Sequence, residues 1–168
     1  MALIPSQSDE IEKLTLPGDL DPVSLHVADA TSKGGKVVIG GKKSKFSPNC
    51  YEPTLITGLK PDMLICKEET FGPVAAIMKF KTEEEAVHLA NLPKTGLAGY
   101  FYSQDHKQIW RVAKKLEVGM LGINEGVFSS AEIPFGGIKE SGIGREGSKY
   151  GLDEYTDIRF VCFGDLSS

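Results

Sequence analysis

The feature that most constrains the fold is an alternation of strand and helix patterns across residues 73–124. Residues 73–81 are a nearly continuous apolar run, the kind found in strands that are buried on both faces. A helix pattern then runs to about residue 92, and strand, helix and strand patterns follow at 96–103, 105–116 and 119–124. This spacing predicts right-handed crossover units and a parallel sheet, so the predicted fold class is α/β.

Both predicted helices of this region carry local signals. The first opens with a capping box, in which Thr82 can accept a hydrogen bond from a main-chain N–H and Glu85 can reach back. The second has an apolar stripe along one side, formed by Ile109, Val112, Ala113 and Leu116.

The residues before this region predict shorter elements. Residues 21–32 predict a helix that ends at Gly34 and Gly35, and strands are expected at 36–39 and 51–57. The apolar positions assigned to that helix are Leu25, Val27, Ala28 and Ala30. Residues 1–20 carry the weakest pattern, with a short helix expected at 9–14.

Two patterns close the chain. Residues 126–151 are rich in glycine and have no strong period, which predicts a long ordered functional loop. The stretch from Tyr155 to Phe163 is rich in aromatic and β-branched residues and predicts a strand. Because a bare apolar edge strand aggregates, this strand is expected to pair with a partner subunit. The predicted divisions are therefore 1–20, 21–125 as an α/β domain, 126–151, and 152–168.

Composition excludes several classes of function. The net charge of −4 over 168 residues disfavours nucleic acid or an anionic membrane surface as a partner. No apolar run approaches the roughly 18 residues of a membrane span, and the first residues resemble neither a secretory signal nor a transit peptide. The three cysteines and three histidines have no metal-ligand spacing, so no metal site is predicted and no histidine is given a role.

Two motifs carry chemical possibilities. Residues 68–73 read EETFGP, where a carboxylate could accept hydrogen bonds from a ribose diol and an aromatic ring could cover a flat heterocycle. The alternative is a solvated glutamate pair and a core phenylalanine. Residues 134–147 are glycine-rich but match neither a dinucleotide fingerprint nor a phosphate-binding loop, which leaves an ordered hinge or lining loop.

Together these motifs resemble the aldehyde dehydrogenase family, whose forms are E-E-x-F-G-P and P-F-G-G-x-K-x-S-G-x-G-R-E. The intervening GLAG at 96–99 and GMLGIN at 119–124 match the same family in the same order, and the resemblance covers residues 24–165. Within the family, residues 129–132, 145–151 and 100–105 are similar to succinate-semialdehyde dehydrogenases.

The resemblance implies a parallel-sheet portion of the aldehyde dehydrogenase catalytic domain with a C-terminal oligomerisation strand. It implies that Glu69 binds the nicotinamide ribose hydroxyls and that Phe71 lies beside the nicotinamide. Ser129 would bind the distal carboxylate of succinate semialdehyde, and Phe135 would line the aldehyde tunnel. Plain alternatives remain, namely an ordinary loop serine and a packing phenylalanine. The location implied by the resemblance is mitochondrial, or cytoplasmic if the 168-residue chain is itself the native product.

The family's reacting groups have no counterpart in these 168 residues. The G-Q-x-C segment of the nucleophile, the L-E-L-G-G segment of the general base, the Rossmann half and the substrate arginines are all missing. No catalytic residue is therefore assigned, and NAD or NADP is implied by the family without being expected to bind this chain alone. An aldehyde substrate is expected only in a full-length enzyme.

Three hypotheses follow. The first is a C-terminal piece of a succinate-semialdehyde dehydrogenase that is inactive alone. The second is an interaction module that joins full-length subunits, forming a homo-oligomer or a pair through the stretch from Tyr155 to Phe163. The third is a thiol activity of Cys66.

Overall fold

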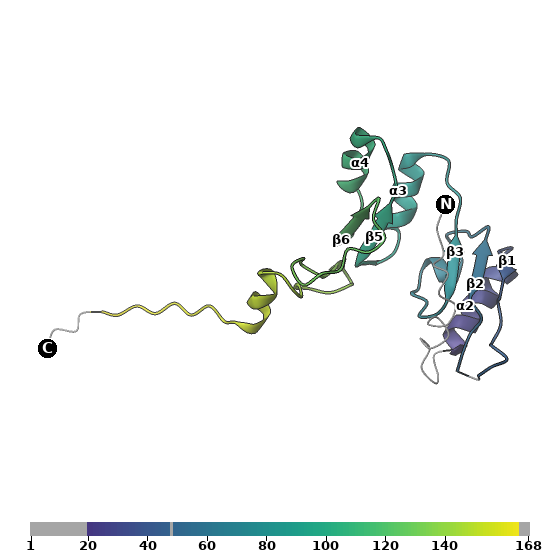
Figure 1. Cartoon of the computed structure of the whole chain (residues 1–168), viewed down its shortest axis with the longest axis horizontal. Helices are drawn as coiled ribbons and strands as arrows, with labels where there is room; N and C mark the ends of the chain where they lie inside the picture. Colours follow the sequence, from purple (N-terminus) through teal and green to yellow (C-terminus); the bar gives the residue numbers. More distant parts are fainter. Residues whose placement is uncertain (1–19, 48, 165–168) are drawn as a thin grey trace. The chain divides into compact units, whose positions relative to one another are not determined.

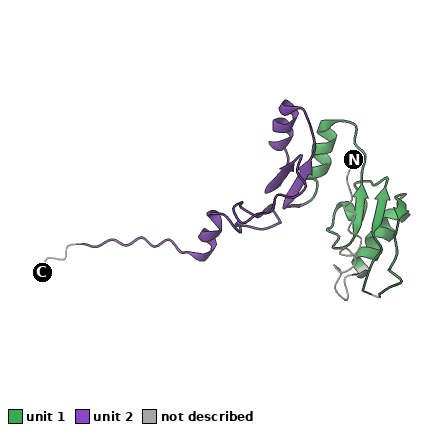
Figure 2. Ribbon diagram, in the orientation of Figure 1, with its two compact units in different colours: residues 1–93 green, residues 94–168 purple. Residues whose placement is uncertain are grey.

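The computed structural model describes residues 20–47 and 49–164. The chain divides into two compact units, Met1–Pro93 and Lys94–Ser168, drawn in green and purple in Figure 2. The sequence pattern did not indicate this division, and the boundaries predicted near residues 20, 125 and 151 stay predictions. The helix expected at 9–14 lies outside the described residues.

The first unit contains a three-stranded sheet in the order β1-β2-β3 (Figure 1). Its strands are β1 (Lys36–Ile39), β2 (Thr54–Thr57) and β3 (Val74–Ile77). Strands β1 and β2 are antiparallel, whereas β2 and β3 are parallel, with Thr54 opposite Val74. The short 3-10 helix η1 (Leu64–Cys66) lies on the connection between the two parallel strands.

Helix α2 (Leu20–Ser32) supplies one side of the hydrophobic core. Its buried residues Val23, Val27 and Ala30 pack in one cluster with Ile56 of β2 and with Met63. Among the apolar positions predicted for this helix, Val27 and Ala30 are buried, but Leu25 and Ala28 are exposed. The buried stripe follows the helical period through residues 23, 26, 27 and 30, so two of the four apolar positions lie outside it.

Helix α3 (Glu83–Asn91) begins as the capping pattern predicted. Thr82 Oγ1 accepts a hydrogen bond from Glu85 N over 3.2 Å. The Glu85 carboxylate also reaches back, but it accepts from Lys81 N over 2.7 Å, one residue before the N-cap. The box therefore satisfies donors on both sides of the helix start.

Strand β3 differs from its prediction. Its apolar sequence predicted burial on both faces, yet Ala75, Ala76 and Ile77 are exposed. The reason is that the buried cluster is centred on α2, β2 and the connection around Met63, and only Val74 and Met78 of the apolar run pack against it.

The second unit contains the predicted strand–helix–strand crossover. Strands β5 (Ala98–Phe101) and β6 (Met120–Ile123) are parallel, and α4 (His106–Ala113) connects them. Asp105 caps α4, since its Oδ1 accepts from the main-chain N–H of the second and third helical residues at 2.9 and 3.3 Å. A separate antiparallel pair joins β4 (Thr95–Gly96) to β7 (Ile138–Lys139).

Within the described part of this single chain, the stretch from Tyr155 to Phe163 has no strand partner, and its predicted pairing with a partner subunit stays a prediction. The 3-10 helix η2 (Tyr150–Tyr155) takes its first residue, and Thr156 then enters extended backbone, with φ −133° and ψ 142°. Residues 156–164 pair with no strand of the described chain, and their apolar side chains are exposed. A strand requires main-chain partners, and none of the described segments of this single chain supplies them.

Candidate functional site

The segment of residues 68–71 leads from η1 into β3 in the first unit. Glu69 is exposed, and Phe71 is 73% exposed. Phe71 is therefore not a residue of the hydrophobic core, which was the plain alternative for this aromatic position. Both side chains are accessible to a ligand.

Neighbouring residues attach this segment to α2. His26 Nδ1 lies 2.7 Å from Thr70 Oγ1, within hydrogen-bond distance. Gly72 lies against Val23 so closely that a Cβ at this glycine would come within 2.7 Å of the valine Cγ2. The glycine of the EETFGP motif thus permits close backbone packing, and the segment is fixed on one side while Glu69 remains exposed.

In the second unit, Ser129 follows the carboxyl end of β6. Asn124 and Ser103 tie the ends of the two parallel strands together, because Asn124 Oδ1 accepts from Ser103 N at 2.9 Å and Asn124 Nδ2 donates to Ser103 O at 2.8 Å. Phe128 stacks on Tyr100 of β5 with ring centroids 5.0 Å apart. Ser129, the residue after Phe128, is exposed.

The next serine is already engaged. A hydrogen bond from Ser130 is the largest cause that lowers the pKa of the exposed Glu132 carboxyl. Ser130 therefore has a local partner, and contact between Ser129 and a ligand stays a prediction.

Phe135 lies at one end of a closed loop. It forms an antiparallel bridge with Glu146, and the intervening glycine-rich segment borders a cavity of about 420 Å³. Arg145 fixes this loop from inside, since its Nη1 donates to the main-chain oxygens of Gly137 and Gly144 at 2.8 and 2.7 Å. The Phe135 ring lines the cavity, and the residue is 36% exposed.

The four sequence-predicted residues thus fall into two pairs. Glu69 and Phe71 share one exposed segment of the first unit, and Ser129 and Phe135 lie on loops of the second. Sequence reasoning gave no role to His26, which is 3% exposed and contacts the segment that carries Glu69. The available signal was its place on the same helical stripe as Val23 and Ala30.

The cysteines give little support to a thiol activity. All three lie in the described part of the chain, and none is in a disulfide. Burial is the main cause that raises the pKa of the Cys66 thiol, with the nearby Asp62 carboxylate adding to it. Both effects disfavour the reactive thiolate, so Cys66 has the wrong environment for a nucleophile.

Residues 20–47 and 49–164 contain neither a metal-binding cluster nor a membrane-spanning helix. No group of three or more His, Cys, Asp or Glu side chains could hold a metal ion there. Over the same residues, no helix has both the length and the apolar character that crossing a membrane requires.

The sequence also matches known proteins. The model of the aldehyde dehydrogenase family matches residues 14–161. The chain belongs to the aldehyde dehydrogenase family. Rat mitochondrial succinate-semialdehyde dehydrogenase is 59% identical over 147 residues, which are 88% of this chain but only 28% of the rat protein. The chain therefore spans little more than a quarter of the length of this relative, and the predicted resemblance to succinate-semialdehyde dehydrogenases is confirmed.

Solved structures agree on the fold. The crystal structure of succinate-semialdehyde dehydrogenase from Burkholderia pseudomallei superimposes with a TM-score of 0.81 at 51% identity, covering 83% of this chain and 29% of that one. The crystal structure of an E. coli NADP dependent enzyme superimposes with a TM-score of 0.83 at 44% identity. The match covers 87% of this chain and 30% of the E. coli enzyme. The predicted α/β portion of the aldehyde dehydrogenase fold is confirmed, and membership of this family implies the use of NAD or NADP by its enzymes.

Proposed function

We propose that these 168 residues form the C-terminal part of an NAD(P)-dependent succinate-semialdehyde dehydrogenase, which oxidises the aldehyde to succinate. The observation that carries the proposal is that Glu69 and Phe71 of the family motif are both exposed. The alternate residues, Thr70 and Gly72, contact side chains of α2 and hold the segment in place. The 59% identity to the rat enzyme supports the choice of substrate. We also propose a mitochondrial location, following the name of that relative.

The exposed pair fits a nicotinamide nucleotide. The Glu69 carboxylate has acceptor sites for both hydroxyls of a ribose, and the Phe71 ring offers an apolar face to a flat heterocycle. A bound nicotinamide cofactor would supply the hydride acceptor of the oxidation. The role of this segment is to orient that cofactor, because hydride transfer depends on accurate placement of the two carbons involved.

The second pair fits the aldehyde. Ser129 would donate a hydrogen bond to the distal carboxylate of the substrate, and Phe135 would exclude water from the apolar part of its path. The loop that carries Phe135 is closed by its bridge to Glu146 and by Arg145, so the ring has a defined place.

Catalysis requires groups from outside the 168 residues. Family members form a covalent intermediate on a cysteine in a G-Q-x-C segment, and none of Cys50, Cys66 and Cys162 lies in that pattern. This segment therefore supplies binding surface, and the proposal assigns the nucleophile and the general base to other parts of the enzyme.

A chimera tests the proposal. The corresponding C-terminal part of the rat enzyme is replaced by residues 14–161 of this chain, and NAD(P)H formation from succinate semialdehyde is measured. The chimera is expected to turn over substrate, whereas the 168-residue chain alone is not.

In the chimera, E69Q should raise the KM for the cofactor about tenfold, which corresponds to roughly one lost hydrogen bond to a charged group. E84Q, at an exposed position of α3, is the matched control. Turnover by the isolated chain, or an unchanged KM in E69Q, would contradict the proposal.

A second function is favoured by the exposed end of the chain. Ile158, Phe160 and Phe163 are 103%, 89% and 79% exposed in a segment with no strand partner among the described residues. Such a segment could add a strand to the sheet of a full-length subunit. The test is co-purification of the tagged chain with a full-length family member. Binding that survives deletion of residues 155–163 would exclude this mode of association.

A further inference from the structure

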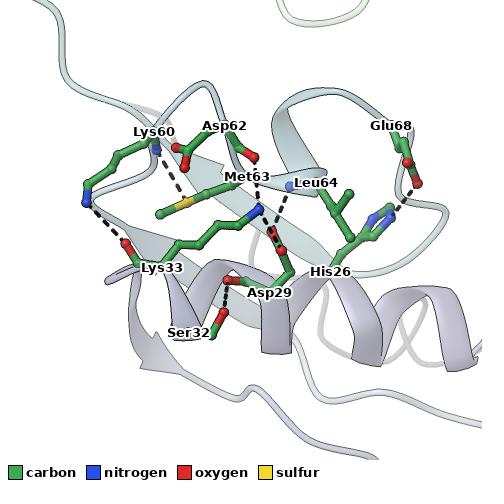
Figure 3. A network of polar contacts seen from close by, with 9 residues as sticks. All are labelled: His26, Asp29, Ser32, Lys33, Lys60, Asp62, Met63, Leu64 and Glu68. Carbon is green, nitrogen blue, oxygen red and sulfur yellow. Dashed lines mark hydrogen bonds and ion pairs between the residues drawn. The ribbon is translucent and has the colours of Figure 1, made fainter.

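Helix α2 presents a polar face to the connection that leads into the cofactor segment. Asp29 Oδ2 accepts a hydrogen bond from Leu64 N over 2.7 Å. Lys33 Nζ donates to Asp62 O over 2.9 Å and forms an ion pair with Asp29 at 2.7 Å. Figure 3 shows Asp29 on α2 and Lys33 directly after its last residue, with both side chains directed toward this connection.

His26 continues this face toward the end of the connection. Its Nδ1 lies 2.7 Å from Thr70 Oγ1, and its Nε2 lies 3.3 Å from Glu68 Oε2. The imidazole is 3% exposed and sits on the buried stripe of the helix between Val23 and Val27. A buried polar ring requires partners, and both partners of this ring come from one short segment.

The contacts of that segment alternate along the chain. Glu68 and Thr70 contact His26, whereas Glu69 and Phe71 are exposed. If the segment slid by one residue, Glu69 or Phe71 would take the place of Thr70 opposite Nδ1, and the short bond between His26 and Thr70 would be lost. The bonds to His26 therefore select the arrangement in which Glu69 and Phe71 are directed away from α2.

We propose that His26 is a positioning residue that sets the orientation of Glu69 and Phe71 for cofactor binding, acting chiefly through Thr70. The functional meaning of this inference rests on the proposed function. The Thr70 bond is the shorter of the two, and Thr70 is partly buried, whereas the Glu68 side chain is 61% exposed and competes with water.

The two bonds can be separated by substitution. Asparagine carries its amide close to the backbone, near the place of Nδ1, so H26N keeps a partner for Thr70. Glutamine carries its amide further out, toward the place of Nε2, so H26Q keeps a partner for Glu68 only. Either amide can present a donor or an acceptor, and the tautomer of the native ring does not affect the design.

The test is amide hydrogen exchange of the full 168-residue chain. The reporters are two amides that flank the segment, Glu68 N, which donates to Leu64 O, and Val74 N, which donates to Gly72 O. We expect H26Q and T70V to raise exchange at these reporters about tenfold, and H26N and T70S to remain within about threefold of the native chain. The slowest amides of β2 should not change. T31V is the matched control, because Thr31 Oγ1 donates within α2, to Val27 O at 2.7 Å.

The outcomes are separable. Equal acceleration in H26N and H26Q, or acceleration that extends equally to β2, would show a general structural role and overturn the inference. If H26N and H26Q both fail to fold, T70V and T70S decide the question, since Thr70 lies outside the hydrophobic core. The measurement involves neither cofactor nor turnover, so its failure is distinct from a failure of the proposed function.

Discussion

Phe135 and Glu146 exchange a pair of main-chain hydrogen bonds, over 2.8 Å from Phe135 N to Glu146 O and 2.7 Å from Glu146 N to Phe135 O. The bridge closes the glycine-rich segment between them into a loop, so the Phe135 ring is presented from a defined backbone. Arg145 stabilises the same loop from within through two carbonyl oxygens.

Replacing Arg145 should open this loop. R145K retains the charge but replaces the planar guanidinium, whose Nη1 bridges Gly137 O and Gly144 O, by a single flexible ammonium. We expect the loop to lose about 1.5–3 kcal/mol of local stability, the range for hydrogen bonds to a charged group. Amide exchange at Glu146 measures this loss. R159K, at an exposed position of the terminal segment, is the control, and a loop as protected in R145K as in the native chain would contradict the prediction.

Adding a methyl group at Gly72 should destabilise the first unit. A Cβ there meets Cγ2 of the buried Val23 at 2.7 Å, and a β-branched side chain in the core has little room to move. G72A is expected to cost about 1–3 kcal/mol in the free energy of unfolding, the usual range for overpacking. Urea denaturation of the full chain measures it.

A double-mutant cycle identifies the cause of that loss. V23A removes the methyl groups in question and has its own cost as a large-to-small core substitution. If the clash with Val23 is responsible, the double variant should lose at least about 1 kcal/mol less than the sum of the single variants. If the two losses of unfolding free energy are additive, the cost of G72A comes from a change in the backbone and not from the contact with Val23.

The start of α3 depends on a side-chain cap. T82A removes the oxygen that accepts from Glu85 N and should cost about 0.5–2 kcal/mol, whereas T82S retains the cap. Exchange of Ala86 N, which donates to Thr82 O, reports on the first turn. No difference between T82A and T82S would show that the Glu85 bond to Lys81 N is sufficient by itself.

Asp29 should contribute an acid-sensitive part of the stability. The Lys33 side chain is the largest cause that holds the pKa of the Asp29 carboxyl below its ordinary value of 3.8, and the Leu64 N–H adds to it. Because the folded-state pKa is depressed, the contribution is present above the unfolded value and is lost as pH falls through the folded one. The difference in unfolding free energy between the native chain and D29N should be constant above about pH 5 and shrink below about pH 4. Urea titrations from neutral pH to below pH 3 test this, and a difference that persists at the acid end would contradict it.

Local sequence patterns predicted much of the secondary structure. The capping box and the helix at 21–32 follow from interactions between residues near each other in the chain, and the periodicity of the sequence was sufficient to predict the strand at 36–39 and the crossover around α4. The prediction was wrong for β3 because an apolar sequence does not reveal which of its faces the rest of the chain covers, and the pairing of the terminal stretch with a partner subunit stays a prediction.

The site divides in the same way. The sequence by itself determined the family and the motif that contains Glu69 and Phe71, because those residues are adjacent and their types are distinctive. Only the tertiary structure decided that His26 and Val23, more than 40 positions earlier, contact Thr70 and Gly72 of that motif. The physical reason is that a lone histidine gives no sign of its partners: its burial becomes meaningful only when the fold brings a distant hydroxyl within 2.7 Å of the ring.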